Sequence, residues 1–366
     1  MPGDRVSAYA AIHARVRAMV ANLLAPTVWQ GLCEAPAFGA LVNMLKATVY
    51  GPYLTQVDEK ALTPRRAVYQ VKMHLANAFA TVIRMAPRHT RSLCLQMARI
   101  FEIDNVKAVL RGLVAGASWD QVRYVLFPLN GFTALPAQEM VEAEGVSAAV
   151  DLLRGTPYYE TLIHAMNRYT AEQSLFPLEV ALDLAYWREL WRDVNQLSGA
   201  DREQAIKLVG SLVDMNNLMW AIRYRIFHRL AEEEIINYTL PFGVRVRDRH
   251  IRAIAAGADV AQVLASIYPD LPDANAFLQS EGRLSNLEIE LQQRIAAQCQ
   301  AAFIGYPFHI GIPLAFLLLT EFEIQDLTVL IEAKSMQLPP ETFSPYLVNR
   351  PQMLSTREPE GLYTRP

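Results

Sequence analysis

Hydrophobic residues recur every three to four positions along most of this chain. In the stretch SAYAAIHARVRAMVANLL the apolar positions that keep this spacing are Tyr9, Ile12, Val16, Met19 and Leu23. A period of this length places apolar side chains on one face of an α-helix. Alternating apolar and polar runs, which would indicate strands, are scarce. The pattern therefore predicts an all-α protein.

A helical motif occurs three times, in FEIDNVKAVLRGL, LVDMNNLMWAIRYR and FEIQDLTVLIEAK. Each copy has an acid at its second or third position, and these acids, Glu102, Asp214 and Glu323, are 112 and 109 positions apart. Flanking stretches recur at matching distances. We predict one domain over residues 1–350, built from three similar units of about 110 residues, each holding a pair of long helices. The units are about 1–160, 161–275 and a shorter 276–350.

Each copy also carries a second polar residue three positions after its acid, so the two side chains lie one helical turn apart on the same face. These candidate site residues are Glu102, Asn105, Asp214, Asn217, Glu323 and Asp326. We favour the interpretation that they form hydrogen bonds between neighbouring helices, since buried polar groups need partners. The alternative is that three polar stripes line a central opening and bind something inside it.

A charge follows six residues after the second polar position, but its sign is not constant. It is Arg111 and Arg223 in the first two copies and Glu332 in the third. We therefore do not expect the three units to contact a partner in the same way.

Residues 301–320 have no formal charge when His309 is neutral, and 20 such residues are long enough to cross a bilayer. The repeat suggests otherwise, because the matching stretches of the other two units carry several charges. The run is also broken by Gly305, Pro307, Gly311 and Pro313. We predict a buried second helix of a helix pair at 308–320.

No motif for catalysis or cofactor binding is present. The sequence contains no GxGxxG or GxxxxGK[ST] for phosphates and no GxSxG or HExxH. The seven histidines fall at no ligand spacing, and Cys33, Cys94 and Cys299 are scattered. A net charge of −3 gives no support for nucleic-acid binding. We expect no catalytic site, no cofactor, no metal and no direct nucleotide binding.

The three motif copies, in this order with YAAIHARVRAMVANLL and LKATVYGPYL near the N-terminus, resemble the C subunit of archaeal-type (A/V-type) rotary ATP synthases. Its eukaryotic counterpart is the d subunit of the vacuolar proton pump. The resemblance covers residues 8 to about 349. It implies a funnel with pseudo-threefold symmetry and no catalytic site, located peripherally on the cytoplasmic face of the cell membrane.

The resemblance also implies partners and a mechanical role. Such a protein sits on the membrane rotor ring of proteolipid subunits and receives the foot of the central stalk, formed by the coiled-coil shaft D and its companion F. It transmits torque for ATP synthesis or ion pumping. The alternative kept open is a cytosolic α-helical repeat scaffold that binds an unrelated helical partner. Residues 351–366, rich in proline and polar residues, are predicted to be disordered.

Overall fold

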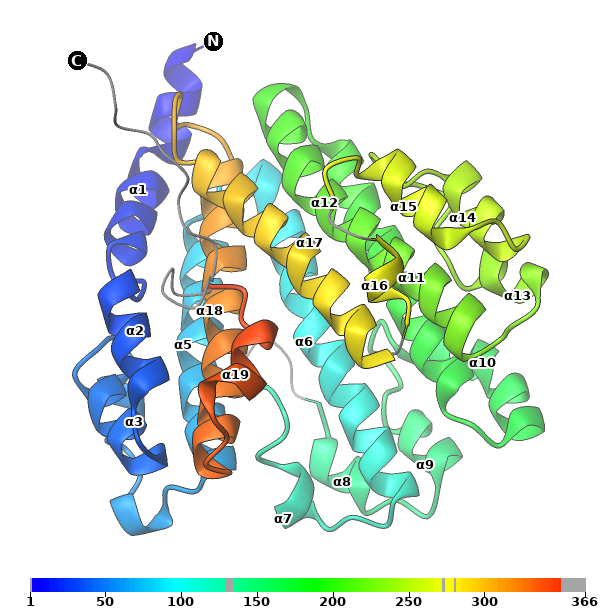
Figure 1. Cartoon of the computed structure of the whole chain (residues 1–366), viewed down its shortest axis with the longest axis horizontal. Coiled ribbons are helices and arrows are strands. Elements are labelled where there is room, and N and C mark those ends of the chain that lie inside the picture. The colour runs from blue at the N-terminus through cyan, green and yellow to red at the C-terminus, as the bar shows by residue number, and fades with distance from the viewer. Residues whose placement is uncertain (1, 130–134, 272–273, 280, 350–366) are drawn as a thin grey trace.

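The computed structural model describes residues 2–129, 135–271, 274–279 and 281–349. Every regular element in these ranges is helical (Figure 1), so the all-α class is confirmed. None of these helices combines the length and the apolar character needed to cross a membrane. The predicted disordered tail lies outside the described residues.

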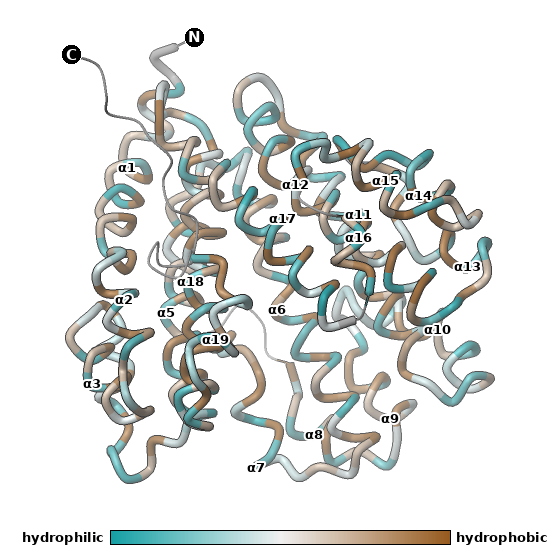
Figure 2. Tube along the Cα trace, in the orientation of Figure 1, coloured by the Kyte–Doolittle hydropathy of each residue, from teal (hydrophilic) through white to brown (hydrophobic). Residues whose placement is uncertain are grey.

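Six long helices form the body of the molecule, two in each predicted unit. They are α5 (Pro64–Met85), α6 (Arg88–Val114), α11 (Phe176–Gln196), α12 (Gly199–Ile222), α17 (Glu281–Ala301) and α18 (Gly311–Ser335). The three motif copies fall on α6, α12 and α18, the second helix of each pair. In Figure 2, hydrophobic and hydrophilic residues are interspersed along most of these helices, as the spacing in the sequence predicts.

Local sequence signals set where the long helices begin. Thr63 precedes α5, and its hydroxyl accepts a hydrogen bond from the Arg66 amide at 3.3 Å. Pro64 follows at the first helical position, where a missing N–H costs nothing. Pro177 and Pro313 likewise fall in the first turns of α11 and α18. The predicted breaks in the uncharged run therefore mark a helix start.

The second half of the uncharged run is a buried helix, which confirms most of the helix predicted at 308–320. Residues 302–310 connect α17 to α18, and the first ten residues of α18, Gly311 to Thr320, are all buried. This half of α18 is apolar around its whole circumference because it is covered on all sides by other helices of the same chain.

The six long helices form a closed ring. Each packs against the next in chain order, and α18 packs against α5; α12 also touches α18. The helices α6, α12 and α18 begin close together at one end of the molecule and diverge toward the other (Figure 1).

Asp201, in the first turn of α12, marks the point where these three helices begin. Its carboxylate accepts hydrogen bonds from the Tyr9 hydroxyl at 2.8 Å and the Ile310 amide at 2.9 Å, and it lies 3.1 Å from Nε2 of His89. His89 belongs to the first turn of α6, and Ile310 directly precedes α18. A buried negative charge is favourable beside helix N-termini.

The other α-helices surround the ring. They are α1 (Pro2–Val20), α2 (Pro26–Glu34), α3 (Phe38–Lys46), α4 (Gly51–Leu54), α7 (Trp119–Val122), α8 (Ala137–Val141), α9 (Val146–Asp151), α10 (Tyr159–Glu172), α13 (Glu232–Asn237), α14 (Asp248–Ala255), α15 (Val260–Ile267), α16 (Ala274–Phe277) and α19 (Pro340–Phe343). The helices α8 and α9 pack on α6, α14 packs on α12, and α3 packs on α18. Each motif helix thus carries short helices on its flank.

Candidate functional site

The second polar residue of the motif fastens its helix to a segment 22 or 23 residues further along the chain. The Asn105 side chain donates to the Phe127 carbonyl at 2.9 Å and accepts from the Phe127 amide at 2.7 Å. Asn217 does the same with Leu240, at 2.8 Å for both bonds. A carboxamide has both a donor and an acceptor, so it can satisfy both backbone groups of one residue.

Asp326 holds the equivalent place in the third helix pair, and its chemistry changes accordingly. A carboxylate only accepts, so it takes the amides of Val348 and Asn349 at 2.7 and 2.8 Å and the Asn349 side chain at 2.9 Å. Burial raises the pKa of Asp326 to about 6, and these donors pull it back only in part.

The acids of the first and third copies each accept a buried tyrosine hydroxyl. Tyr158 donates to Glu102, and Tyr50 donates to Glu323 at 2.6 Å. Glu323 also accepts the Leu24 amide at 2.8 Å. Burial raises the pKa of Glu323 to about 7, because these donors offset only part of the cost of removing a carboxylate from water.

Asp214 is held by backbone amides instead. It accepts from Val244, Arg245 and Val246 at 2.8, 2.7 and 3.1 Å. Burial raises its pKa, while the three amide donors oppose that shift. The residue before this segment is Gly243, where a side chain would clash with the Val246 carbonyl and the Asp214 carboxylate. The glycine therefore permits the chain to wrap around the acid.

The structure thus brings each predicted pair together with a neighbouring segment of the same chain. All six side chains are buried, with exposures between 0 and 4%. Five of these residues also lie away from the two cavities described below, and Asn105 alone lines one of them. Contact between these residues and a partner stays a prediction.

Sequence reasoning missed the tyrosines that complete these clusters. They follow a shared pattern, an aliphatic residue, two others, Ser or Thr, one other and Tyr, found at Leu45–Tyr50, Leu153–Tyr158 and Val263–Tyr268. In each, the hydroxyl of the Ser or Thr donates to the carbonyl of the aliphatic residue, at 2.7 Å in all three. The pattern is visible in the sequence. It was missed because it follows the motif helix in the first and second copies, whereas the pattern that serves the third copy lies near the N-terminus.

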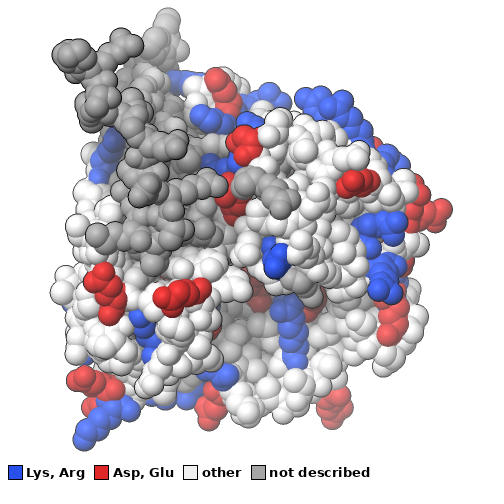
Figure 3. Space-filling view, in the orientation of Figure 1, with Lys and Arg blue, Asp and Glu red and all other residues white. Residues whose placement is uncertain are grey.

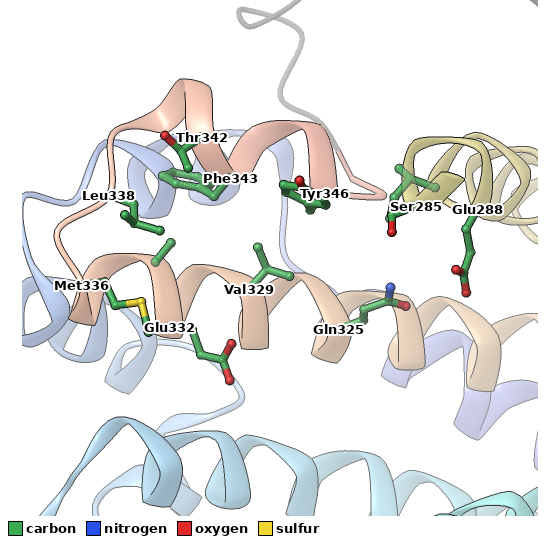
Figure 4. A pocket seen from close by; sticks show the side chains of 12 residues that line it. Ser285, Glu288, Gln325, Val329, Glu332, Met336, Leu338, Thr342, Phe343 and Tyr346 are labelled. Atoms are coloured by element: carbon green, nitrogen blue, oxygen red, sulfur yellow. The ribbon is translucent and has the colours of Figure 1, made fainter. Parts of the chain in front are cut away.

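Two adjoining cavities lie along α18. One, of about 430 Å³, is enclosed by α5, α6 and α18; the other, of about 450 Å³, lies between α17, α18 and residues 338–346. Both are lined by Gln325 and Val329, so they meet on α18. Figure 4 shows the second cavity, and Figure 3 shows this face of the molecule hollowed beside α19 and below α17.

Charged residues occupy the boundaries between helix pairs. At the α6–α11 boundary, Arg111 makes two bonds to Glu179, at 2.6 and 2.8 Å. At the α12–α17 boundary, Arg223 lies 3.7 Å from Glu288. These arginines are the positions noted in the sequence, and each meets a glutamate on the first helix of the next pair.

The α18–α5 boundary has the opposite polarity. Glu332 stands where the other pairs have arginine, and a lysine, Lys72, occupies α5. Burial lowers the pKa of Lys72, while Asp104 and Glu332 raise it. Glu321, which lines the same cavity as Lys72, has its pKa raised to about 7 by burial and by the nearby Asp104.

Comparison with known proteins identifies relatives along almost the whole chain. The family model described as ATP synthase (C/AC39) subunit matches residues 12–346. The C subunit of the A-type ATP synthase of Methanocaldococcus jannaschii is 24% identical over 93% of this chain and 86% of its own length. The proteins of the same name from Pyrococcus abyssi and Methanococcoides burtonii are 23% and 24% identical, covering 91% and 93% of this chain and 88% and 94% of their own lengths.

Proposed function

The chain belongs to the ATP synthase (C/AC39) subunit family and is part of an A/V-type ATP synthase, and from this premise we propose that it is the rotor's socket. In this role it couples the central stalk to the membrane rotor ring and transmits torque for ATP synthesis or ion pumping. It has no catalytic site, cofactor or metal of its own. It is peripheral, on the cytoplasmic face of the membrane.

The observation that supports this proposal is the closed ring of six long helices, with two adjoining cavities along α18 that carry charged residues. Each long helix is held on both sides by another, so twisting one displaces its neighbours. Close-packed interiors transmit strain because they have little room to deform. A ring of this kind, arranged as a pseudo-threefold funnel of three helix pairs, is suited to pass torque between two partners.

The two ends of the ring suit two different partners. The helices α6, α12 and α18 diverge at the end where the cavity residues Glu332 and Glu288 lie, and this end accepts the foot of the shaft D with its companion F. The end where the three helices meet at Asp201 faces the ring of proteolipid subunits. Charged groups around a concavity orient an incoming partner and set its register.

Co-elution tests this proposal. The purified full-length chain is mixed with the purified complex of D and F from the same source and run on size exclusion at low and moderate salt. A stable 1:1:1 complex is expected. An unrelated dimeric coiled coil of similar length serves as the control and is expected to elute separately. No complex with D and F, even at high concentration and low salt, would instead favour a helical scaffold for an unrelated partner.

A further inference from the structure

We propose that the α18–α5 boundary fixes the rotational angle of the bound shaft, by accepting a basic side chain of the shaft at Glu332. This inference rests on the proposed function, because it concerns how the same cavity holds the stalk. It assigns a specific contact residue and the chemistry of the group that meets it.

At two of the three boundaries between helix pairs, the arginine of the motif helix forms an ion pair with a glutamate of the next pair. Arg111 and Glu179 form a two-point ion pair, the geometry in which a guanidinium binds a carboxylate most strongly. Arg223 and Glu288 form a looser pair at 3.7 Å. At both places the positive charge of the motif helix is neutralised within the chain, so it offers a partner little net charge.

At the third boundary both charges are left available. Within the described part of the chain, the Glu332 carboxylate makes no hydrogen bond and no ion pair, and its side chain is exposed. The ammonium of Lys72 has no ion pair there either, although Glu332 is near enough to raise its pKa. This boundary therefore differs from the other two in the sign of its charges and in leaving them unpaired.

The surroundings of Glu332 define what fits there. In Figure 4, Glu332 points from α18 to the side of that helix away from Phe343, and Glu288 lies on α17 at the other end of the cavity. Among the residues that the structure describes, no lysine or arginine lines this cavity, and its remaining wall includes Val329, Met336 and Phe343. Lysine and arginine combine an apolar stem with a charged end, so such a side chain can pack its stem against apolar residues of α18 and place its charge beside Glu332.

A socket with three equivalent boundaries would hold a shaft equally well in three orientations. A single boundary of different charge removes that degeneracy, because a basic side chain on the shaft is attracted at one position. At the other two positions it meets the paired arginines Arg111 and Arg223. Specificity of this kind comes from a difference in affinity between the correct and the incorrect arrangement.

The test measures binding of the D and F complex to the full-length chain by calorimetry at low salt. We compare the wild type with Glu332→Gln, Glu332→Lys and a matched control, Glu341→Gln. Glu341 is an exposed acid on α19 that does not line the cavity. Glu332→Gln is expected to weaken binding at least tenfold, Glu332→Lys to weaken it further, and Glu341→Gln to stay within twofold of the wild type.

Charge reversal on the shaft identifies the partner group. Each lysine and arginine at the foot of D is changed in turn to glutamate, and one such variant is expected to bind the Glu332→Lys chain better than it binds the wild type. Wild-type affinity in Glu332→Gln would overturn the inference while leaving the socket intact. If the wild type does not bind D and F at all, the proposed function fails as well.

The same variants also distinguish misfolding and self-association of the chain from loss of stalk binding. Glu332 is exposed, so its variants are expected to keep the wild-type helical signal in circular dichroism; a lost signal together with lost binding would point to misfolding and contradict the contact role. If Glu332→Gln alters self-association of the chain on size exclusion instead of stalk binding, the cavity accepts a second copy and the inference is wrong.

Discussion

Several acids in this protein are removed from water without a cation beside them. Glu321 lies between α5, α6 and α18, has no hydrogen-bond or ion-pair partner among the described residues, and keeps part of its side chain open to the cavity. Burial and Asp104 raise its pKa from about 4.5 to about 7. The folded protein therefore favours the protonated acid, whereas the unfolded chain ionises it at lower pH.

The sign of the resulting pH dependence follows from linkage. A carboxyl whose folded pKa is raised contributes stability that is fully present below its unfolded pKa and is lost as pH rises through the folded value. For Glu321 that window runs from about pH 4.5 to about pH 7. Glu323, with a pKa raised to about 7, acts in the same direction.

Glu321→Gln is predicted to raise the free energy of unfolding at pH 8 by up to about 3 kcal/mol, since one unit of pKa shift corresponds to about 1.4 kcal/mol. At about pH 3.5, roughly one unit below the unfolded pKa, the variant and the wild type are expected to agree, because the acid is then mostly protonated in both states. Urea unfolding across this range measures the difference. Glu341→Gln, at an exposed site, is the control; a gain of the same size at both pH values would contradict this account.

At the scale of elements, the chain closes on itself through its N-terminal segment. Tyr50, at the end of the segment that contains α2 and α3, donates to Glu323 on α18, as Tyr158 does to Glu102 on α6. The Lys334 ammonium donates to the Cys33 carbonyl at 2.7 Å, which adds a second contact between α18 and this segment. We propose that residues 26–54 complete the third unit, whose own chain ends early.

Tyr50→Phe and Tyr158→Phe are therefore predicted to destabilise the protein by similar amounts, about 1.5–3 kcal/mol each, because each removes a hydroxyl donor from a buried carboxylate. Thermal and urea unfolding of both variants test this. Tyr306→Phe, at a half-exposed tyrosine, is the matched control and is expected to change little. A large loss for Tyr158→Phe with none for Tyr50→Phe would contradict the equivalence of the two segments.

The positions of the long helices could be predicted from the local sequence pattern. The contacts between distant segments could not be predicted, and the reason is physical. The motif that recurs around Glu102, Asp214 and Glu323 located the second helix of each pair, because its apolar residues keep the three-to-four spacing of a helix. The contact between Tyr50 and Glu323 spans 273 positions. Such a contact depends on how the ring closes, which no local period encodes.

The pairing of charged residues between helices could not be predicted from the local sequence pattern either. The sequence has Glu332 where the other units have arginine, but it could not show that α18 packs against α5, where Lys72 lies near Glu332. Recognising that match requires knowing which helices are neighbours. The structure shows which helices are neighbours. It places Glu332, which replaces the arginine of the other units, at a boundary where the motif helix carries a negative charge instead of a positive one.

For the whole molecule, a single substitution at the meeting point of the three motif helices tests how strongly the ring of long helices is held together. Asp201 joins α1, α6, α12 and the start of α18 through Tyr9, His89 and Ile310. Asp201→Ala is predicted to lower the free energy of unfolding by about 1–3 kcal/mol for each buried donor that loses its acceptor, namely the Tyr9 hydroxyl and the Ile310 amide. Chemical denaturation measures this.

Asp270→Ala is the control for that variant, because Asp270 pairs with Arg294 at a position where its side chain is 69% exposed. Exposed pairs contribute little to stability. Equal losses for the two substitutions would show that Asp201 does not hold the ring together.

An electron cryomicroscopy map of the intact ATP synthase complex tests most directly whether this chain is the socket between the stalk and the rotor ring. We predict that the foot of the shaft enters at the end where α6, α12 and α18 diverge, beside Glu332, with the Asp201 end turned toward the ring of proteolipid subunits. A map in which the cavity is empty, or in which the shaft contacts the outer surface of the six-helix ring, would contradict it.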